Sequence, residues 1–590
     1  MTTTRTIRLT AILSYSVSSA TLPSTGGGSP HNVLISSTTN HVKLGSGNTV
    51  WGMTLGNNSS GTGLRGLNAG NLKVRDVTIN TSTAAVVLSN AILDVIVNSI
   101  SSGGGTNGIS LSSTTGSFDV EGGGPSDPTN TTRGRTTAKS GGGTLTLGSG
   151  GTIQNAAGAG VLLSGATNIT LRNMVIKNNG GSGVNSGAPG IDASGSSNLI
   201  LDNVTITGQT GNGGLYASTL AGLTIQHTQI SSNATNASLI GTGVWNVGFG
   251  PYTCTTTCAN GLTGTATVSN SIFDTTADTA FGMNNYNAST VSLATANNQF
   301  SNTGDYGLQS NAYNTSNVTL SVTGSSVFNN TNGGINYEGS DSSGGGATTV
   351  SNNTFDQNGS TGGSDVNVVH QGLGTTYSFD IESNTTRQTY VSNSGASIAV
   401  ALGAGANSAT VLQGKILNNI VGKASVTDSG SSSNSGIALI TNAPGTLTAR
   451  VTGNTVVQTD YDGLQVLGNG QNTSTINITA SANDFEVSPT DPNTNLGLEL
   501  TSGNNGGADT ICANISGNTR FRGNSGVAGI ATEVLGTATI LLQGYTGVAN
   551  NGASIATFLN GMATTVTPGG LNFGGGGTVK KAPSNCPTAP

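Results

Sequence analysis

The chain has 590 residues, little charge and much glycine: 7% of the residues are charged, 92 are glycine, and the formal net charge is -6. A hydrophobic fraction of 34% with many Val, Ile and Thr residues favours ordered β structure over disorder, because β-branched side chains suit a pleated surface. The 19 Lys and Arg residues form no basic run, which argues against nucleic-acid binding. No apolar stretch approaches the roughly 20 residues of a membrane helix.

Residues 1–64 are predicted to form an N-terminal β segment or cap with the first irregular coils. The first 20 residues contain Arg5 and Arg8, a weak apolar run and a small-residue end near Ala20, which together make a poor signal peptide. Ser14 and Ser16 interrupt the apolar run and favour a first β-strand instead. Both interpretations stay open at this stage.

One short phrase returns along the chain: an apolar alternation, then Asn, then another apolar residue. Examples are NITLRNMVIKNN from Asn168, NLILDNVTITGQ from Asn198, VSLATANNQFSNT from Val291 and LTARVTGNTVVQT from Leu447. Neighbouring copies lie about 24 to 36 residues apart, which is a solenoid period. The predicted interior column consists of the anchor residues of these copies: Ile176, Ile206, Ile230, Phe273, Phe300, Phe328, Phe355, Ile420, Val456 and Phe485.

A second phrase, Gly followed by an aliphatic residue, comes about six to eight residues after most anchors. It occurs at Gly183-Val184, Gly214-Leu215, Gly307-Leu308, Gly334-Ile335, Gly463-Leu464 and Gly529-Ile530. Each period therefore holds at least two short strands separated by a polar turn. Such strands are stable only when successive copies stack in parallel, with Val, Ile and Phe inside and Asn side chains laddered at the turns. The period is too short for a β-propeller or for immunoglobulin-like units.

These phrases resemble the right-handed parallel β-helix repeat of pectate-lyase-like proteins, autotransporter passenger domains and many large bacterial surface proteins. The resemblance covers most of residues 65–545 and implies an all-β, single-stranded parallel β-helix, a solenoid. Residues 101–150 and 241–262 break the period and are predicted to be loop excursions or irregular coils. Residues 546–590 are predicted to form a C-terminal cap and a Gly/Pro-rich tail. The resemblance identifies the fold rather than the function, because one fold hosts many functions.

Four cysteines are present, and two disulfides, Cys254–Cys258 and Cys512–Cys586, are the simplest pairing for an extracellular Gly-rich chain. The sequence alone does not prove this connectivity. The four histidines, His31, His41, His227 and His370, are isolated. We therefore predict no metal site and no cofactor, since a zinc site needs further ligands at short spacing.

Candidate catalytic residues are few. Asp380 and Glu382 lie two apart on a predicted strand and so point the same way, with His370 upstream; a solvated outer face explains them more simply. Asp460 and Asp462 flank Tyr461 in a TDYDGLQ phrase.

A related phrase, TGDYGLQ, contains Asp305 and Tyr306, and the recurrence favours structural turns capped by Asp. Asp274 and Asp278 flank the turn after Phe273, with no partner in view. The motifs of serine hydrolases, HExxH metalloproteases and P-loop proteins do not occur.

The sequence thus favours a secreted or cell-surface structural protein, adhesin-like, whose outer face binds glycans or a partner weakly. The alternative is a carbohydrate-active enzyme of the pectate-lyase-like class, a polysaccharide lyase or glycoside hydrolase. That enzyme would need acidic and basic side chains in one outer groove, beside aromatic residues such as Tyr306, Tyr337 or Tyr461. Ice binding and a phage tailspike are weaker alternatives.

Overall fold

The computed structural model describes residues 33–34, 40–58, 60–122, 147–181, 188–211, 213–233, 245–252, 254, 258–340, 344–387, 395–469, 473–488, 495–524, 527–567 and 576–590. The chain divides into two compact units, Met1–Ala234 and Thr235–Pro590, and each is treated by itself. The interior of both units follows from the alternation seen in the sequence, because inward and outward side chains alternate along each strand.

The first unit consists of parallel strands that wind through successive coils. Its longest strands pair side by side in the order β3, β4, β5, β7, β9, β12 and β15. The strands are β1 (Val33–Leu34), β2 (Val42–Leu44), β3 (Thr49–Asn58), β4 (Leu64–Thr81), β5 (Val86–Val97), β6 (Ser99–Ser102), β7 (Ile109–Val120), β8 (Gly151–Gln154), β9 (Val161–Arg172), β10 (Met174–Lys177), β11 (Ile191–Asp192), β12 (Ser196–Asp202), β13 (Thr205–Thr207), β14 (Leu215–Ala217), β15 (Thr219–Gln226) and β16 (Gln229–Asn233).

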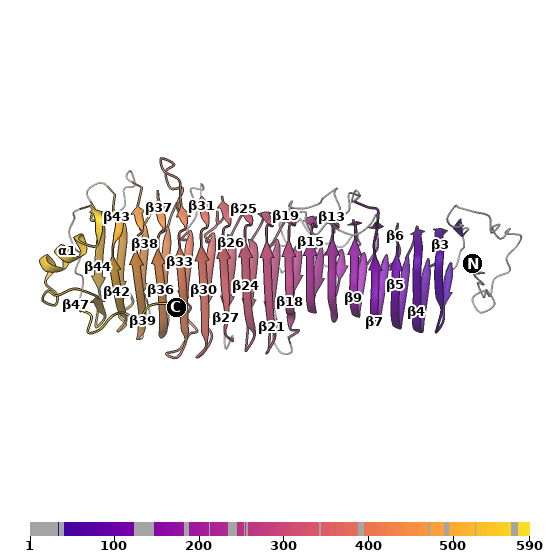
Figure 1. The fold of residues 1–590 in the computed structure, drawn as a ribbon, viewed down its shortest axis with the longest axis horizontal. Coiled ribbons are helices and arrows are strands. Elements are labelled where there is room, and N and C mark those ends of the chain that lie inside the picture. The colour runs from indigo at the N-terminus through magenta and orange to yellow at the C-terminus, as the bar shows by residue number, and fades with distance from the viewer. Residues whose placement is uncertain are drawn as a thin grey trace, which may run out of the picture. The chain divides into compact units, whose positions relative to one another are not determined.

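Through most of the second unit each strand pairs in parallel with the third strand after it, so that a coil contributes one strand to each of three sheets. Figure 1 shows β21, β24, β27 and β30 of the first sheet side by side. This sheet contains β18 (Gly261–Ser269), β21 (Thr290–Ala296), β24 (Asn317–Thr323), β27 (Gly346–Ser351), β30 (Thr376–Glu382), β33 (Val411–Leu417), β36 (Gly445–Thr452), β39 (Ser474–Ser481), β42 (Thr510–Ser516), β45 (Thr539–Leu542) and β47 (Thr578–Lys581).

The second and third sheets of this unit are built in the same way. The second contains β19 (Ile272–Thr276), β22 (Gln299–Thr303), β25 (Ser326–Asn330), β28 (Thr354–Asp356), β31 (Thr385–Arg387), β34 (Ile420–Val421), β37 (Thr455–Val457), β40 (Asp484–Glu486), β43 (Asn518–Arg522) and β46 (Ala563–Val566). The third contains β17 (Val247–Phe249), β20 (Phe281–Asn285), β23 (Tyr306–Ala312), β26 (Gly333–Gly339), β29 (Val366–His370), β32 (Ile398–Leu402), β35 (Ile437–Thr441), β38 (Leu464–Gly468), β41 (Leu498–Ser502) and β44 (Ile530–Val534). The predicted right-handed parallel β-helix is confirmed.

Two of the predicted interior anchors are wrong. Phe328 is half-buried and Ile420 is exposed, whereas the neighbouring Val327 and Val421 lie in the interior. Each wrong anchor belongs to a pair of adjacent apolar residues, and strand alternation admits only one member of such a pair to the core. The structure buries the other anchors: Ile176, Ile206, Ile230, Phe273, Phe300, Phe355, Val456 and Phe485.

A ladder of buried asparagine side chains runs through the corner between the first two sheets of the second unit. The Nδ2 group of Asn384 donates to Oδ1 of Asn419 at 3.0 Å and to the carbonyl oxygen of Val350 at 2.8 Å. The same contact repeats from coil to coil, so each amide satisfies the next. The ladder comprises Asn353, Asn384, Asn419, Asn454, Asn483 and Asn518.

The predicted loop excursions differ in part from the structure. Residues 109–120, expected in a loop or an irregular coil, form the regular strand β7, which pairs with β5 and β9. The apolar alternation of this segment, rather than its spacing from the next copy, determines the strand. Residues 123–146, 241–244, 253 and 255–257 of the predicted excursions lie outside the described residues.

The C-terminal part of the chain contains a helix and two further strands, β46 and β47. Helix α1 (Gly552–Asn560) begins after Asn551, whose side chain accepts a hydrogen bond from the amide of Ser554 at 3.0 Å, and it buries Ile555 and Leu559. Both predicted disulfides, Cys254–Cys258 and Cys512–Cys586, are present. Across the described ranges, no helix is apolar and long enough to cross a membrane.

Candidate functional site

Two aspartates stack at the corner between the second and third sheets of the second unit. The register pairs Phe281 with Leu308, so Asp278 and Asp305, each three residues earlier, occupy equivalent positions on successive coils. One coil later Tyr306 pairs with Gly333, which places Asn332 in the same column as the two aspartates. We call Trp245, Tyr252, Asp278, Thr279, Asp305, Tyr306 and Asn332 the corner site.

The carboxyl groups of Asp278 and Asp305 hydrogen-bond to one another. Thr279 donates to one Asp305 oxygen at 3.1 Å, and the side-chain amide of Asn332 donates to the other at 2.8 Å. Burial raises the pKa of the Asp305 carboxyl above its ordinary value, and its hydrogen bonds oppose this shift only in part. Two carboxylates at hydrogen-bonding distance do not both ionise readily, so the pair shares a proton.

Aromatic rings surround this carboxyl pair. The indole of Trp245 covers the backbone of Gly248 and Gly282, where any side chain would collide with the ring. Tyr252 meets Trp245 edge-on, with ring centroids 6.3 Å apart, and its own side chain is 44% exposed. Burial raises the pKa of the Tyr252 hydroxyl, and the nearby carboxylates of Asp278 and Asp305 raise it further.

Two further groups complete the corner site. The ring of Tyr306 lies against Gly333, and burial together with the Asp305 charge raises the pKa of the Tyr306 hydroxyl. The indole Nε1 of Trp245 is buried and has no hydrogen-bond partner among the described residues. The corner site therefore combines an exposed aromatic ring and a fixed carboxyl group that come from three successive coils.

A second carboxyl pair, Asp462 and Glu499, lies at the same corner several coils further along the chain. Asp462 is 4% exposed and hydrogen-bonds to Glu499. Burial raises the pKa of Asp462 well above its ordinary value, and the neighbouring Glu499 charge raises it further. Gln465 and Thr501 donate to Glu499 at 2.8 and 3.1 Å and hold it in place.

The candidate residues Asp460 and Asp462 make separate contacts. The backbone oxygen of Asp460 accepts a hydrogen bond from Asn495, whereas the Asp462 carboxylate accepts one from the amide of Leu496 at 2.9 Å. Asp462 therefore joins two coils instead of capping its own turn. Sequence reasoning missed Glu499, because the partner comes from a strand one coil later.

Asp380, Glu382 and His370 do not form a cluster. Asp380 and Glu382 point outward from β30, and Asp380 pairs with Lys415 of the next coil at 3.4 Å. His370 is buried in the interior, where its ring stacks on Tyr377 at 5.2 Å. The solvated-face interpretation of the acidic pair explains this arrangement.

Of the three tyrosines named for the outer groove of an enzyme, Tyr337 does not lie on the outer face. It lies in the interior, stacked on Tyr377 with centroids 4.1 Å apart. Tyr461 is 46% exposed, and Tyr306 belongs to the corner site. Of the two aspartates after Phe273, Asp278 has Asp305 as its partner, and Asp274 accepts hydrogen bonds from Ser301 and Asn302 at 2.6 Å.

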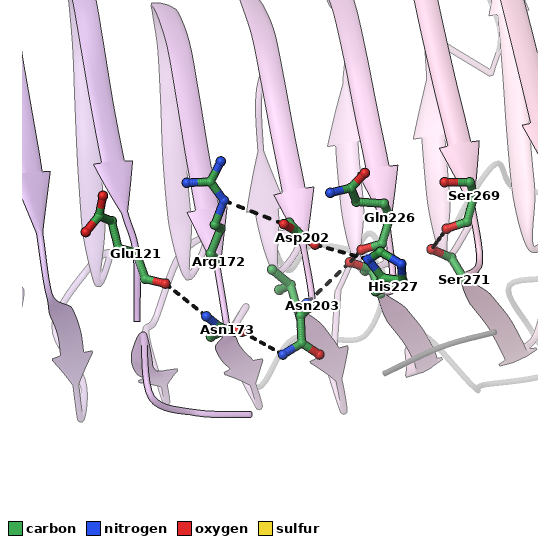
Figure 2. Close-up of polar contacts among 11 residues, drawn as sticks. Glu121, Arg172, Asn173, Asp202, Asn203, Gln226, His227, Ser269 and Ser271 are labelled. Carbon is green, nitrogen blue, oxygen red and sulfur yellow. Dashed lines mark hydrogen bonds and ion pairs between the residues drawn. The ribbon is translucent and has the colours of Figure 1, made fainter. Parts of the chain in front are cut away.

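The first unit holds a buried polar cluster, shown in Figure 2. The Asp202 carboxylate, 1% exposed, lies between Arg172 Nε at 3.6 Å and His227 Nδ1 at 3.3 Å. Beside it, Asn203 donates to Asn173 at 2.7 Å. His227 has a left-handed backbone, φ 50°, as do Asn173 and Asn203 in earlier coils, so we assign the cluster a structural role at this turn.

No three His, Cys, Asp or Glu side chains gather closely enough to hold a metal ion in the part of the chain that the structure describes. No protein-family model and no curated protein matches the sequence. Among solved structures, the "Crystal structure of PfbA, a surface adhesin of Streptococcus pneumoniae" is similar, at 13% identity over 86% of this chain and 85% of that chain, with a TM-score of 0.20. At these values the likeness carries no argument about what this chain binds or catalyses.

Proposed function

We propose that this is an extracellular or cell-surface β-helical protein that binds glycans at the corner site. Two disulfides fit an oxidising compartment. The observation that carries the proposal is the exposed Tyr252 ring held edge-on by Trp245 beside the Asp278–Asp305 pair. Sugar rings pack on aromatic side chains through their C–H faces, and fixed carboxyl and amide groups accept and donate hydrogen bonds to their hydroxyls.

The charge of the corner site favours neutral sugars. The Asp278–Asp305 pair retains negative charge when it shares one proton, and Glu338 adds to the field felt by Tyr306. A uronic acid or sulfated sugar would meet like charge at close range. Neutral hexose chains are therefore the expected ligands, and acidic polysaccharides are expected to bind more weakly.

Binding of the full chain to an array of neutral and acidic polysaccharides tests the proposal. Tyr252→Ala removes the stacking surface, and Asp305→Asn breaks the shared-proton pair; each should weaken binding at least tenfold. Tyr461→Ala is the matched control, because Tyr461 is an equally exposed tyrosine on another coil. Retention of wild-type affinity by Tyr252→Ala, or equal loss in Tyr461→Ala, would refute the assignment.

Glycoside hydrolysis is the alternative function, and the carboxyl pair does not favour it. Glycosidases place their two carboxyl groups about 5–10 Å apart, on either side of the scissile bond, whereas those of Asp278 and Asp305 hydrogen-bond to one another. The release of new reducing ends from any polysaccharide that binds, abolished by Asp305→Asn but not by Asp460→Asn, is the expected result for an enzyme. Binding without new reducing ends would leave the protein a glycan-binding protein only.

A further inference from the structure

One outward column of the first sheet in the second unit is buried where an outer face should be exposed. Thr448, Asn477 and Cys512 lie in register on β36, β39 and β42, and all three are buried. Their neighbours in sequence, Leu447 and Ile476 among them, fill the interior, so this column points outward. Something on the outside of the sheet therefore covers it.

The cover is narrow. The adjacent outward column, Thr446, Thr475 and Thr510 on the same strands, remains partly exposed. A second β-sheet or a helix, about 10 Å wide, would bury neighbouring columns as well. A single extended segment of chain accounts for a strip that is one column wide.

The C-terminal tail has the position and the length to form this cover. Cys586 is bonded to Cys512, its amide donates to Gln543 at 2.8 Å, and Ala582 packs with the two cysteines. Within the tail, Ala582, Cys586 and Ala589 are buried, and the other residues are exposed. The tail therefore lies with one edge against the protein.

The dimensions agree with this placement. Parallel coils are spaced by about 4.8 Å, so Thr448 lies about 10 Å from Cys512 along the stack. Three extended residues of a Pro-containing segment, from Cys586 to Ala589, span about 9 Å. In Figure 1 the end of the chain, marked C, is drawn beside β36, the strand of Thr448. Pro583, Pro587 and Pro590 lack an amide hydrogen, so this segment is a poor β-strand.

We propose that residues 582–590 form a strap, latched onto the Thr448–Asn477–Cys512 strip by the Cys512–Cys586 disulfide and released when a dithiol reduces that bond. In the reduction the sulfur–sulfur bond breaks and each cysteine gains a proton, while the two thiols of the reductant become a disulfide. After reduction, only the burial of three small side chains and a few hydrogen bonds hold the strap. These contacts contribute too little free energy to offset the conformational entropy lost when nine residues are ordered. The inference does not depend on glycan binding.

Once the strap has left, the Thr448–Asn477–Cys512 strip is an exposed polar surface with the free thiol of Cys512 at one end. Its side chains, Thr448 and Asn477, hydrogen-bond to each other at 3.3 Å and offer hydroxyl and amide groups to a replacement segment. The redox state of one disulfide therefore sets whether this part of the outer face is covered. The Cys254–Cys258 disulfide closes a short loop elsewhere and has no part in the latch.

Alkylation of Cys512 in the full chain carrying Cys586→Ser tests the proposal. With the latch removed, a maleimide should modify Cys512 within about tenfold of the rate for a small free thiol. An unchanged thermal midpoint of the β-helix would show that the variant is folded. A folded variant in which Cys512 resists modification would mean that packing alone holds the strap, and the proposal would be wrong.

A measurement on the unaltered protein guards against misfolding of that variant. Leu541, which packs against the strap, should become several-fold more reactive to hydroxyl-radical footprinting when dithiothreitol reduces the latch. Exposed Leu373 is the internal reference, and Cys258→Ser, which removes the other disulfide, should leave Leu541 unchanged. No change at Leu541 after complete reduction, verified by mass, would overturn the proposal.

Discussion

The ring of Phe300 stacks on the ring of Phe273 one coil earlier, with centroids 5.2 Å apart and planes 11° apart. The register continues from Phe300 to Val327 and then to Phe355, so a valine interrupts the aromatic stack. Phe328, the neighbour of Val327, lies on the other side of its strand and is half-buried. The same substitution at these two phenylalanines therefore compares the inner side of one coil with the outer side of the next.

Phe300→Asp should destabilise the protein severely, because it places an unpaired carboxylate in the dry interior and removes a stacked ring. We expect a loss of more than about 4 kcal/mol, or insoluble protein. Phe328→Asp makes the same chemical change on the outer side of the next coil and should cost about 1 kcal/mol or less. Thermal unfolding of both variants is the measurement, and equal midpoints would contradict the inward assignment of Phe300.

The sequence predicts the coil architecture because its signals are local. Strand alternation, turn asparagines and glycines all act within a few residues, and stacking identical units multiplies them. Sequence reasoning took Phe328 instead of Val327 as the interior anchor, although a local signal separates the two residues. Interior anchors follow the buried ladder residue by two positions, as Phe355 follows Asn353 and Val421 follows Asn419.

The corner site was harder to predict because its contacts join different coils. Asp278 and Asp305 are 27 positions apart, and only the exact register of the turns brings their carboxyl groups together. Glu499 reaches Asp462 in the same way. A sequence alone gives the period of the repeat but not the lengths of individual turns, and one residue more or less at a turn would separate each pair.

Asn419→Ala should weaken the second unit by breaking the asparagine ladder. The change removes the acceptor used by both the amide and the side chain of Asn384, leaving two buried donors unsatisfied. Each such donor costs about 1–3 kcal/mol, so for two donors we expect a loss of about 2–6 kcal/mol. Asn469→Ala breaks a comparable amide contact with Asn442 at the surface and should cost little. Urea unfolding compares the two, and a similar loss in both would argue against the ladder as a stabilising element.

His370 makes the interior sensitive to acid. Burial lowers the pKa of its imidazole to about 4, below the ordinary value of 6.5. As the pH falls from about 6.5 toward 4, the unfolded chain gains a proton that the folded protein resists, so stability decreases. His370→Phe keeps a ring stacked on Tyr377 but cannot titrate, and its thermal midpoint should fall less between pH 7 and pH 4.5 than that of the wild type. A parallel pH dependence in both proteins would exclude His370 as the cause.

Asp462 imposes the opposite pH dependence, because burial and the Glu499 charge raise its pKa well above the ordinary carboxyl value. At a pH above the ordinary carboxyl pKa, the unfolded chain releases the Asp462 proton while the folded protein keeps it. The stability that Asp462 contributes at low pH is therefore lost as the pH rises from the ordinary pKa through the raised pKa of the folded protein. Asp462→Asn is neutral at every pH, and its amide can donate to Glu499 while its oxygen accepts from Leu496. Its thermal midpoint should therefore match the wild type near pH 4 and exceed it near pH 8. Asp460→Asn, two residues away on the same turn, should track the wild type throughout. A variant at position 462 that is less stable at both pH values would mean that the carboxyl is ionised in the folded protein, and the shared hydrogen bond with Glu499 would have to be abandoned.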